Sequence, residues 1–226
     1  MIRRAQGHNV TTTRMGLPLH NARFTLIRHG RTTYNADHRL NGDPSIPVHL
    51  DDLGLQQCVD CRARVHGEHF DLAIHTPFVR TAESLDILLA GTDVPRRVMP
   101  EFGDVQLGIF EGGPLADYRA WRAHRPLTER PPSGGESRVD ALIRYTEGAE
   151  VLLQLDARNV VAVLHDIPIR FLANAANGDD PIDGPITKIG NMQAYTFTDR
   201  DISYAIDVMR RYAESHQPET ASTPGP

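Results

Sequence analysis

Two patterns of hydrophobic and polar positions alternate along this chain. Short, strongly apolar runs predict buried β-strands, whereas longer segments with apolar residues at three- and four-residue steps predict helices. The run Val160–Leu164 is apolar throughout, which is typical of a strand covered on both faces. The predicted strands are Phe24–Arg28, Asp71–His75, Arg96–Met99, Asn159–Leu164 and Ala194–Thr198.

Predicted helices lie between most of these strands. They cover Leu53–Val65, Pro77–Leu89 and Gly135–Ala157, and a further helix follows Asp166 with Pro168 in its first turn, where proline is tolerated. Because strands alternate with helices, the chain is expected to form an α/β domain with a largely parallel sheet.

The two ends of the chain lack such patterns. Residues 1–22 predict a mobile extension, and their arginine-rich, acid-free composition also resembles a transit peptide, although unstructured termini are commoner. Ile202–Ile206 is expected to pair with Ala194–Thr198 as a hairpin. Residues 213–226 are rich in proline, serine and threonine and predict a disordered tail. One folded domain over residues 23–212 remains.

Composition narrows the classes of partner. A net charge of −5 with a pI near 6.1 argues against nucleic acid. No apolar stretch approaches the length that crosses a bilayer, so no membrane association is expected. With only two cysteines, the chain has no disulfide framework, which favours a reducing compartment such as the cytoplasm. Any anion must therefore bind at a local cluster of positive charge.

Two predicted strands end in histidine. His29 follows Phe24–Arg28, and His165 follows Asn159–Leu164. Ligands of open α/β sheets bind at the carboxyl ends of the strands. Arg28 and Gly30 flank His29, so a guanidinium, an imidazole and a glycine that lets the backbone approach a ligand lie together.

The segment Leu26–Asn35 resembles the signature R-H-G-x-T/S-x-x-N of the histidine phosphatase superfamily, which includes phosphoglycerate mutases and many phosphatases. Five defining positions match: Arg28, His29, Gly30, Thr32 and Asn35. Further blocks resemble the family in the same order, namely Arg39–Gly42, Thr76–Ser84, Phe102–Gly112, Gly134–Ser137 and Leu164–His165. The resemblance implies a three-layer α/β/α sandwich of the phosphoglycerate mutase type. The short Gly108–Gly112 pattern is more similar to the phosphatase branch.

The resemblance also implies the residues that bind and transfer phosphate. A phosphate monoester carries close to two negative charges, which Arg28 and Arg80 can meet with paired N–H donors. A cationic His165 would add a third positive donor. Thr32 and Asn35 are candidates for neutral hydrogen bonds to the remaining oxygens.

His29 is the expected nucleophile and must be neutral before attack. Neighbouring guanidinium groups should lower its pKa, and the Gly30 carbonyl could accept one ring N–H and fix the tautomer. The leaving alcohol needs a proton. In the family a glutamate supplies it, and Asp104 stands at that position here. Asp104 is therefore expected to act first as general acid and then as general base.

Asp166 departs from the family, which usually has glycine after this histidine. We expect it to cap the following helix, while the alternatives are a carboxylate that raises the pKa of His165 or one that faces the substrate. Arg119, Arg122 and Arg125 recur every third residue beside Tyr118 and Trp121. They either line the pocket mouth or form a solvated basic face with Trp121 packed inward.

Two other motifs give weaker evidence of a function. Cys58 and Cys61 have redox spacing but fall within a predicted helix, so structural thiols are expected. His66 and His69 lack the spacing of a helical zinc site, and nothing in the sequence requires a metal or another cofactor.

The expected function is hydrolysis of a small phosphorylated metabolite through phospho-His29. The alternatives are phosphoryl transfer of the phosphoglycerate mutase type and a non-catalytic phosphate-binding regulatory module. The oligomeric state stays open, with a homodimer among the options.

Overall fold

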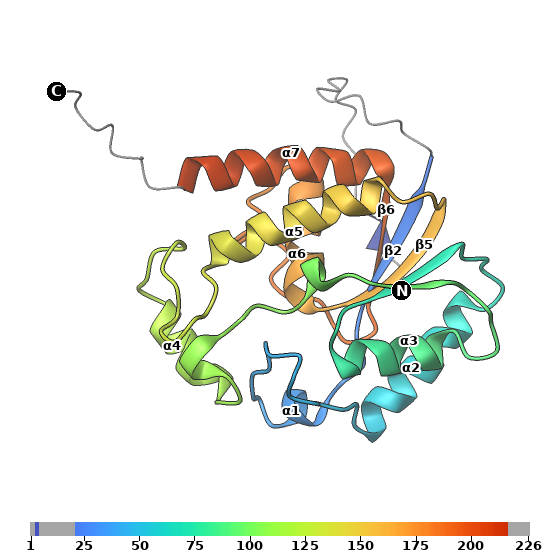
Figure 1. Ribbon diagram of the computed structural model, residues 1–226, viewed down its shortest axis with the longest axis horizontal. Helices are drawn as coiled ribbons and strands as arrows, with labels where there is room; N and C mark the ends of the chain where they lie inside the picture. Colours follow the sequence, from blue (N-terminus) through green and yellow to red (C-terminus); the bar gives the residue numbers. More distant parts are fainter. Residues whose placement is uncertain (1–2, 5–20, 217–226) are drawn as a thin grey trace.

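A computed structural model describes residues 3–4 and 21–216 and contains one six-stranded sheet in the order β1-β6-β2-β5-β3-β4 (Figure 1). Strand β2 pairs in parallel with β5, β5 with β3, and β3 with β4, whereas β6 is antiparallel to β2. The predicted largely parallel sheet is therefore confirmed. The strand bounds are β1 Arg3–Arg4, β2 Arg23–Arg28, β3 Leu72–His75, β4 Arg96–Val98, β5 Asn159–Leu164 and β6 Ala194–Thr198.

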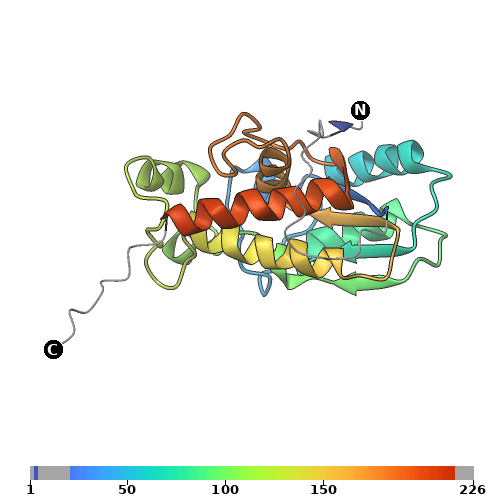
Figure 2. The same cartoon turned by 90° about the horizontal axis from the view of Figure 1, so that it is seen from above.

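Helices cover both faces of this sheet. Helices α2 and α3 lie on one face and α5, α6 and α7 on the other, which confirms the three-layer sandwich (Figures 1 and 2). The helix bounds are α1 Thr33–Ala36, α2 Asp52–Val65, α3 Val79–Leu88, α4 Leu115–Arg122, α5 Arg138–Leu153, α6 Asp166–Ala176 and α7 Asp199–His216, with short 3₁₀ turns at Pro100–Phe102 and Gly108–Phe110. No helix of these described residues is long and apolar enough to cross a membrane.

Strand β5 explains why a continuous apolar run is needed at the centre. Val161 and Val163 pack into the cluster formed with α2 and α3, whereas Val160, Ala162 and Leu164 pack into the larger cluster on the opposite face. Successive side chains of a strand point to opposite faces, so both sets must be apolar when both faces are covered.

The predicted hairpin at the end of the chain is wrong. Strand β6 pairs with β2, and the residues after it form the eighteen-residue helix α7, which packs against α5 and α6. The reason is a capping arrangement at Thr198. Its backbone N–H donates to the Asp201 carboxylate over 2.8 Å, and the Asp201 N–H donates to the Thr198 hydroxyl over 3.2 Å. Thr198 and Asp201 thus start a helix where a turn was expected.

The terminal boundaries also need correction. Helix α7 runs to His216, so residues 213–216, assigned to the disordered tail, are helical. At the other end Arg3–Arg4 pairs in parallel with β6, and the carbonyl of Ala22 accepts a hydrogen bond from the N–H of Asp199. Parts of the predicted mobile extension are therefore ordered. The rest of both predictions, residues 1–2, 5–20 and 217–226, lies outside the described residues.

Candidate active site

The carboxyl ends of β2 and β5 bring two histidines together. Arg28 lies opposite Leu164 in the register of these strands, so His29 and His165 follow adjacent strand ends. The N–H of His29 donates to the carbonyl of Leu164 over 3.0 Å, and the two imidazole centroids are 5.4 Å apart. Both side chains are buried. The parallel pairing that the sequence predicted thus places both histidines at one edge of the sheet.

A cavity of about 780 Å³ opens over these strand ends. Most of the predicted site residues line it, and the set comprises Arg28, His29, Thr32, Asn35, Arg80, Asp104, Arg119, Arg122 and Asp166. His165 is completely buried and is not part of the cavity wall, but it contacts Arg80 and Asp104, which are. The sequence therefore identified a set of residues that the fold gathers around one space.

His29 has a defined tautomer. Its Nδ1 lies 2.7 Å from the carbonyl of Gly30, which can only accept, so Nδ1 carries the proton. The Nε of Arg80 donates to Nε2 over 3.2 Å, so Nε2 presents its lone pair. Burial, followed by the charges of Arg80 and Arg28, lowers the pKa of His29 well below its ordinary value of 6.5. The imidazole is neutral near pH 7, as expected of a nucleophile.

Arg80 is the central cation of the site. It extends from α3, is only 3% exposed, and burial lowers its pKa to about 10, so it stays charged near neutral pH. Besides His29, its guanidinium contacts the side-chain oxygen of Asn41 at 2.5 Å, Asp104 at 3.1 Å and Nδ1 of His165 at 3.2 Å. One guanidinium therefore orients both imidazoles and the carboxylate.

The expected cationic His165 is wrong for the free site. Burial, followed by the charge of Arg80, lowers the pKa of His165 well below 6.5, and the charge of Arg28 adds to the effect. Since a guanidinium has donors only, Nδ1 of His165 accepts from Arg80 and the ring proton resides on Nε2. A cationic His165 was expected because it would bind the phosphate. In the fold, burial and the neighbouring guanidinium groups destabilise the imidazolium form.

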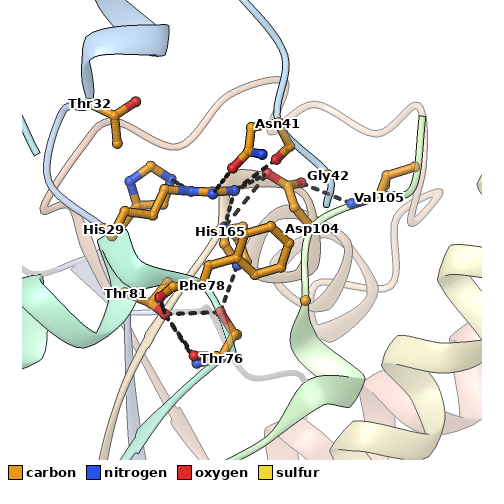
Figure 3. Close-up of polar contacts among 12 residues, drawn as sticks. His29, Thr32, Asn41, Gly42, Thr76, Phe78, Thr81, Asp104, Val105 and His165 are labelled. Atoms are coloured by element: carbon orange, nitrogen blue, oxygen red, sulfur yellow. Dashed lines mark hydrogen bonds and ion pairs between the residues drawn. The ribbon is translucent and has the colours of Figure 1, made fainter. Parts of the chain in front are cut away.

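A chain of hydroxyls completes the orientation of His165 (Figure 3). Its Nε2 lies 2.9 Å from the hydroxyl of Thr76, which lies 2.9 Å from that of Thr81. The Thr81 hydroxyl donates to the carbonyl of Phe78 over 2.8 Å, so each donor has one acceptor and the chain ends at the backbone. Both threonines are fully buried, and sequence reasoning gave them no role.

Asp104 reaches the same point from the loop after the first 3₁₀ turn. One carboxylate oxygen lies 3.1 Å from Nη2 of Arg80 and 3.6 Å from Nδ1 of His165, while the other accepts the N–H of Val105 over 3.0 Å. Burial raises the pKa of Asp104, and the charge of Arg80 offsets only part of that effect. A raised pKa is the direction that proton donation requires.

Arg28 is held by the segment before β6. Its Nη1 donates to the carbonyl of Ile189 over 2.6 Å, and its own carbonyl accepts the N–H of Met192 over 2.9 Å. Asn191 adds a bond from its amide to the carbonyl of His29 over 2.9 Å. Arg28 therefore lines the cavity with its guanidinium braced from behind and further N–H groups available to a ligand.

Thr32 and Asn35 bond to each other. The Thr32 hydroxyl accepts the N–H of Asn35 over 3.1 Å, and the Asn35 carbonyl oxygen accepts the N–H of Thr32 over 3.2 Å. This reciprocal capping box starts α1. Both residues also line the cavity, so their first role is to shape the turn after His29. The hydroxyl proton and the Asn35 amide N–H groups are the donors that this box leaves for a ligand.

Asp166 is not the predicted N-cap. His165 occupies that position, and Asp166 is the first residue of α6. One carboxylate oxygen accepts the N–H of Ile189 over 2.8 Å, which ties α6 to the segment that braces Arg28. The alternative in which Asp166 charges His165 also fails, because the pKa of His165 is lowered. Asp166 does line the cavity, in agreement with the remaining alternative.

Arg119, Arg122 and Arg125 were expected either to line the pocket mouth or to form a solvated face, and the structure divides them between these two arrangements. Arg119 and Arg122 line the cavity, whereas Arg125 pairs with Glu129 and lies 5.5 Å from the ring of Trp121. Trp121 packs partly buried against the core, as the alternative of an inward-facing tryptophan required.

Sequence reasoning missed Asn41, which is 8% exposed and accepts from Arg80 with both its side-chain and backbone oxygens. Its neighbour Gly42 makes this possible. A Cβ on Gly42 would lie 1.9 Å from the carbonyl oxygen of Val105, so only glycine lets the two loops meet here. The signal was a polar residue before a glycine within a segment that resembles the family.

The remaining motifs lie elsewhere. Cys58 and Cys61 are buried in α2, and burial raises the pKa of both thiols, in agreement with structural roles. Among residues 3–4 and 21–216, no group of three histidine, cysteine or acidic side chains is arranged to hold a metal ion.

Comparison with known sequences adds an independent view of the chain. It is 27% identical over 167 residues to 2,3-bisphosphoglycerate-dependent phosphoglycerate mutase 2 of Gloeobacter violaceus, with 67% of this chain and 74% of that protein covered. It is 32% identical over 128 residues to glucosyl-3-phosphoglycerate phosphatase of Mycobacterium tuberculosis, with 54% and 56% covered. Relatives in both reaction classes thus share this sequence pattern.

Solved structures agree on the fold. The alpha-ribazole phosphatase of Shigella flexneri superposes with a TM-score of 0.64 at 20% identity, with 77% of this chain and 89% of that chain covered. The mycobacterial glucosyl-3-phosphoglycerate phosphatase gives a TM-score of 0.60 at 25% identity, with the same shares covered. The family profile of the histidine phosphatase superfamily (branch 1) matches residues 24–209, so this chain belongs to that superfamily.

Proposed function

We propose that this protein is a phosphomonoesterase that hydrolyses a small phosphorylated metabolite through a phosphohistidine on His29. Arg28 and Arg80 bind the phosphoryl oxygens, and Asp104 acts as general acid and then as general base. The observation that carries the proposal is the tautomer of His29. A buried, neutral ring whose Nδ1 proton is held by the Gly30 carbonyl presents the lone pair of Nε2 beside Arg80, in the cavity that Arg28 and Arg80 also line.

In the first step Nε2 of His29 attacks the phosphorus, and the bond between phosphorus and the ester oxygen breaks. In the free site, Nε of Arg80 donates to Nε2 of His29. When the N–H groups of Arg80 donate to the phosphoryl oxygens instead, the lone pair of His29 Nε2 becomes free to attack. Asp104 gives its proton to the departing alkoxide. His165, 3.2 Å from Nη2 of Arg80, can take up positive character only when the bound dianion offsets the surrounding charge.

In the second step a water molecule attacks the phosphorus of phospho-His29. Asp104, now a carboxylate, accepts a proton from this water, and the bond between phosphorus and Nε2 breaks. Inorganic phosphate leaves, and both His29 and Asp104 return to their starting protonation states. The raised pKa of Asp104 favours its protonated form at the start of each cycle.

The test is to trap the intermediate. Purified protein mixed with a radiolabelled phosphomonoester and quenched in alkali should retain label that acid releases, since phosphohistidine is labile to acid and stable to base. We expect His29→Ala to lose both the label and phosphate release. Retained turnover in that variant, or label on another residue, would contradict the proposal.

Phosphoryl transfer of the mutase type is the second candidate, and the similarity to a phosphoglycerate mutase favours it. The two reactions share the phosphohistidine and differ in its acceptor, which is water or a second hydroxyl. Phosphate release and phosphoglycerate isomerisation measured on the same preparation separate them. Fast isomerisation with negligible release would favour the mutase.

A non-catalytic phosphate-binding module would bind phosphate with no need for a neutral, aligned imidazole. The ordered tautomer of His29 and the raised pKa of Asp104 therefore support the enzyme. Binding of inorganic phosphate without turnover of any phosphomonoester would instead favour the module.

A further inference from the structure

A second cluster of cations lines the same cavity away from the two histidines. Arg122 lies in α4, Arg138 is the first residue of α5, and Arg170 lies in α6. We refer to these three residues as the outer arginine cluster. Nine arginines and lysines line the cavity against three aspartates, although the whole chain has a net charge of −5. The cavity is thus a concentrated region of positive charge.

The outer arginine cluster has buried N–H groups without partners. Nη1 of Arg122, Nε and Nη1 of Arg138 and Nε of Arg170 are buried and donate to no acceptor among residues 3–4 and 21–216. Buried donors in native proteins are nearly always hydrogen-bonded, and each exception needs an explanation. Arg138 is the strongest case because two of its donors face no acceptor. The three side chains that carry these donors line the cavity, so their positive charges act on an anion bound there.

The surrounding carboxylates offset this charge only in part. The nearest guanidinium nitrogen of Arg122 lies 3.8 Å from Asp183, whose side chain is 58% exposed. Burial lowers the pKa of Arg170, and the charge of Asp166, which also accepts the N–H of Ile189, offsets only part of that effect. Burial and then repulsion by Arg138 lower the pKa of Arg122, and burial dominates the lowering for Arg170 as well. Like charges therefore remain together in a partly dry space.

Helix α6 runs from beside the buried His165 to the outer arginine cluster. Asp166 follows His165 directly, and Arg170 lies four residues further along α6, a rise of about 6 Å. Both Asp166 and Arg170 line the cavity, as residues four apart on one helix face do. An alcohol portion of a few carbon atoms is about as long as this rise along the helix.

We propose that the outer arginine cluster binds a second anionic group, a carboxylate or a phosphate, on the alcohol portion of the phosphomonoester substrate. This inference rests on the proposed phosphatase function and names the substrate class within it. An uncharged alcohol would displace water from the guanidinium groups and offer them only neutral acceptors, which bond a guanidinium more weakly than a carboxylate or a phosphate does, so the site discriminates against it.

A matched pair of substrates tests the inference. Phosphoglycerate and glycerol phosphate carry the scissile phosphate on a terminal carbon and differ in a carboxylate against a hydroxymethyl group. Hydrogen bonds to charged groups predict kcat/KM about 10–100-fold higher for the carboxylated member. A sugar bisphosphate compared with its monophosphate forms the second arm and distinguishes phosphate from carboxylate as the preferred anion.

The variant Arg138→Met keeps most of the length of the side chain and removes its charge. Nε and Nη1 of Arg138 make no hydrogen bond among residues 3–4 and 21–216, and its guanidinium lies 5.9 Å from the ring centroid of Tyr118, which a methionine side chain can still contact. We expect the preference for the charged member of a pair to fall about 10-fold or more in this variant. Arg125→Met is the matched control, because Arg125 pairs with Glu129 outside the cavity, and it should preserve the preference.

The outcomes separate this inference from the proposed function. If the parent protein hydrolyses charged and uncharged members equally in both arms, the inference fails and the phosphatase stands. An unchanged preference in Arg138→Met also overturns it. If no member of either pair is hydrolysed or labels His29, the proposed function itself fails.

Discussion

Asp104 stands at a position where the family pattern that this chain resembles has glutamate. The side chain of Asp104 is shorter than that of a glutamate by one C–C bond, about 1.5 Å. The fold compensates by holding it from two sides, through the N–H of Val105 at 3.0 Å and Nη2 of Arg80 at 3.1 Å. The position and the raised pKa of Asp104 together meet what a general acid needs.

Replacing Asp104 by asparagine tests its role through the leaving group. For an alkyl phosphate, whose alkoxide must be protonated as it departs, we expect kcat/KM to fall about 10²–10⁴-fold in Asp104→Asn. For nitrophenyl phosphate, whose leaving group is stable without a proton, the rate of the first step should fall much less in Asp104→Asn. Steady-state rates on the two substrates and burst kinetics on the second give the measurement.

Equal losses on both substrates would contradict this assignment and indicate that Asp104 only positions Arg80. Asp104→Glu is the companion variant, because it restores a titratable carboxyl of the length that the family uses. We expect it to recover activity on the alkyl phosphate, whereas a purely steric role would make the longer side chain harmful.

At the scale of elements, the site depends on two loops that meet without side chains between them. The loop that carries Asn41 contacts the loop of Asp104 and Val105 through Gly42. The N–H of Gly42 also donates to both oxygens of the Glu111 carboxylate, at 3.0 Å for the longer contact. The position of Asn41, which accepts from Arg80, is therefore set by backbone packing.

Gly42→Ala should separate these loops. The added Cβ would lie 1.9 Å from the carbonyl oxygen of Val105, so one backbone must move. Overpacking of this kind typically costs about 1–3 kcal/mol. We expect a lower melting temperature together with a loss of kcat/KM, because Arg80 loses an acceptor and reorients. Thermal denaturation and steady-state kinetics measure the two effects.

Gly113→Ala is the control in a neighbouring segment. Its added Cβ approaches the Phe110 carbonyl oxygen at 3.2 Å, which a small shift relieves. If Gly42→Ala has the same melting temperature and kcat/KM as this control, the close approach of the two loops contributes neither to stability nor to activity.

At the scale of the whole molecule, folding buries two neutral histidines beside arginines. In the unfolded chain each titrates near 6.5, whereas in the folded protein the pKa of both is well below that value. Below pH 6.5 the unfolded state therefore binds more protons, and stability falls as the pH falls toward the folded pKa values. Asp104 acts in the opposite sense, since its raised pKa favours the folded state at acidic pH.

His165→Gln should make stability less dependent on pH. Below pH 6.5 each buried neutral histidine contributes a slope of about 1.4 kcal/mol per pH unit, and the variant removes one such contribution. The free energy of unfolding by urea at pH 7 and at pH 5.5 measures it. His69→Gln serves as the control, since the His69 side chain is 91% exposed. The same pH dependence in His165→Gln and the parent protein would show that His165 is not buried as a neutral ring.

The positions of most strands and of helices α2, α3, α5 and α6 along the chain could be predicted, because each depends on the pattern of neighbouring residues. The apolar run of β5 and the helical spacing of α5 carry their own signals. The start of α7 was missed because its capping box at Thr198 and Asp201 resembles a turn, and only packing against α5 and α6 separates a helix from a hairpin there. Arg28, His29 and Arg80 could be identified because phosphoryl transfer needs guanidinium donors and a nucleophile, and these residues stand in the motifs that resemble the family.

By itself the sequence determined the α/β class, the family pattern and the residues that meet in the cavity, since strand ends and motif order are local properties. Only the tertiary structure decided the charge of His165, the role of Asp166, the hydroxyl chain from Thr76 and the unpaired donors of the outer arginine cluster. Each of these depends on burial and on partners far away in the chain. Desolvation and hydrogen-bond pairing exist only once distant segments have packed together.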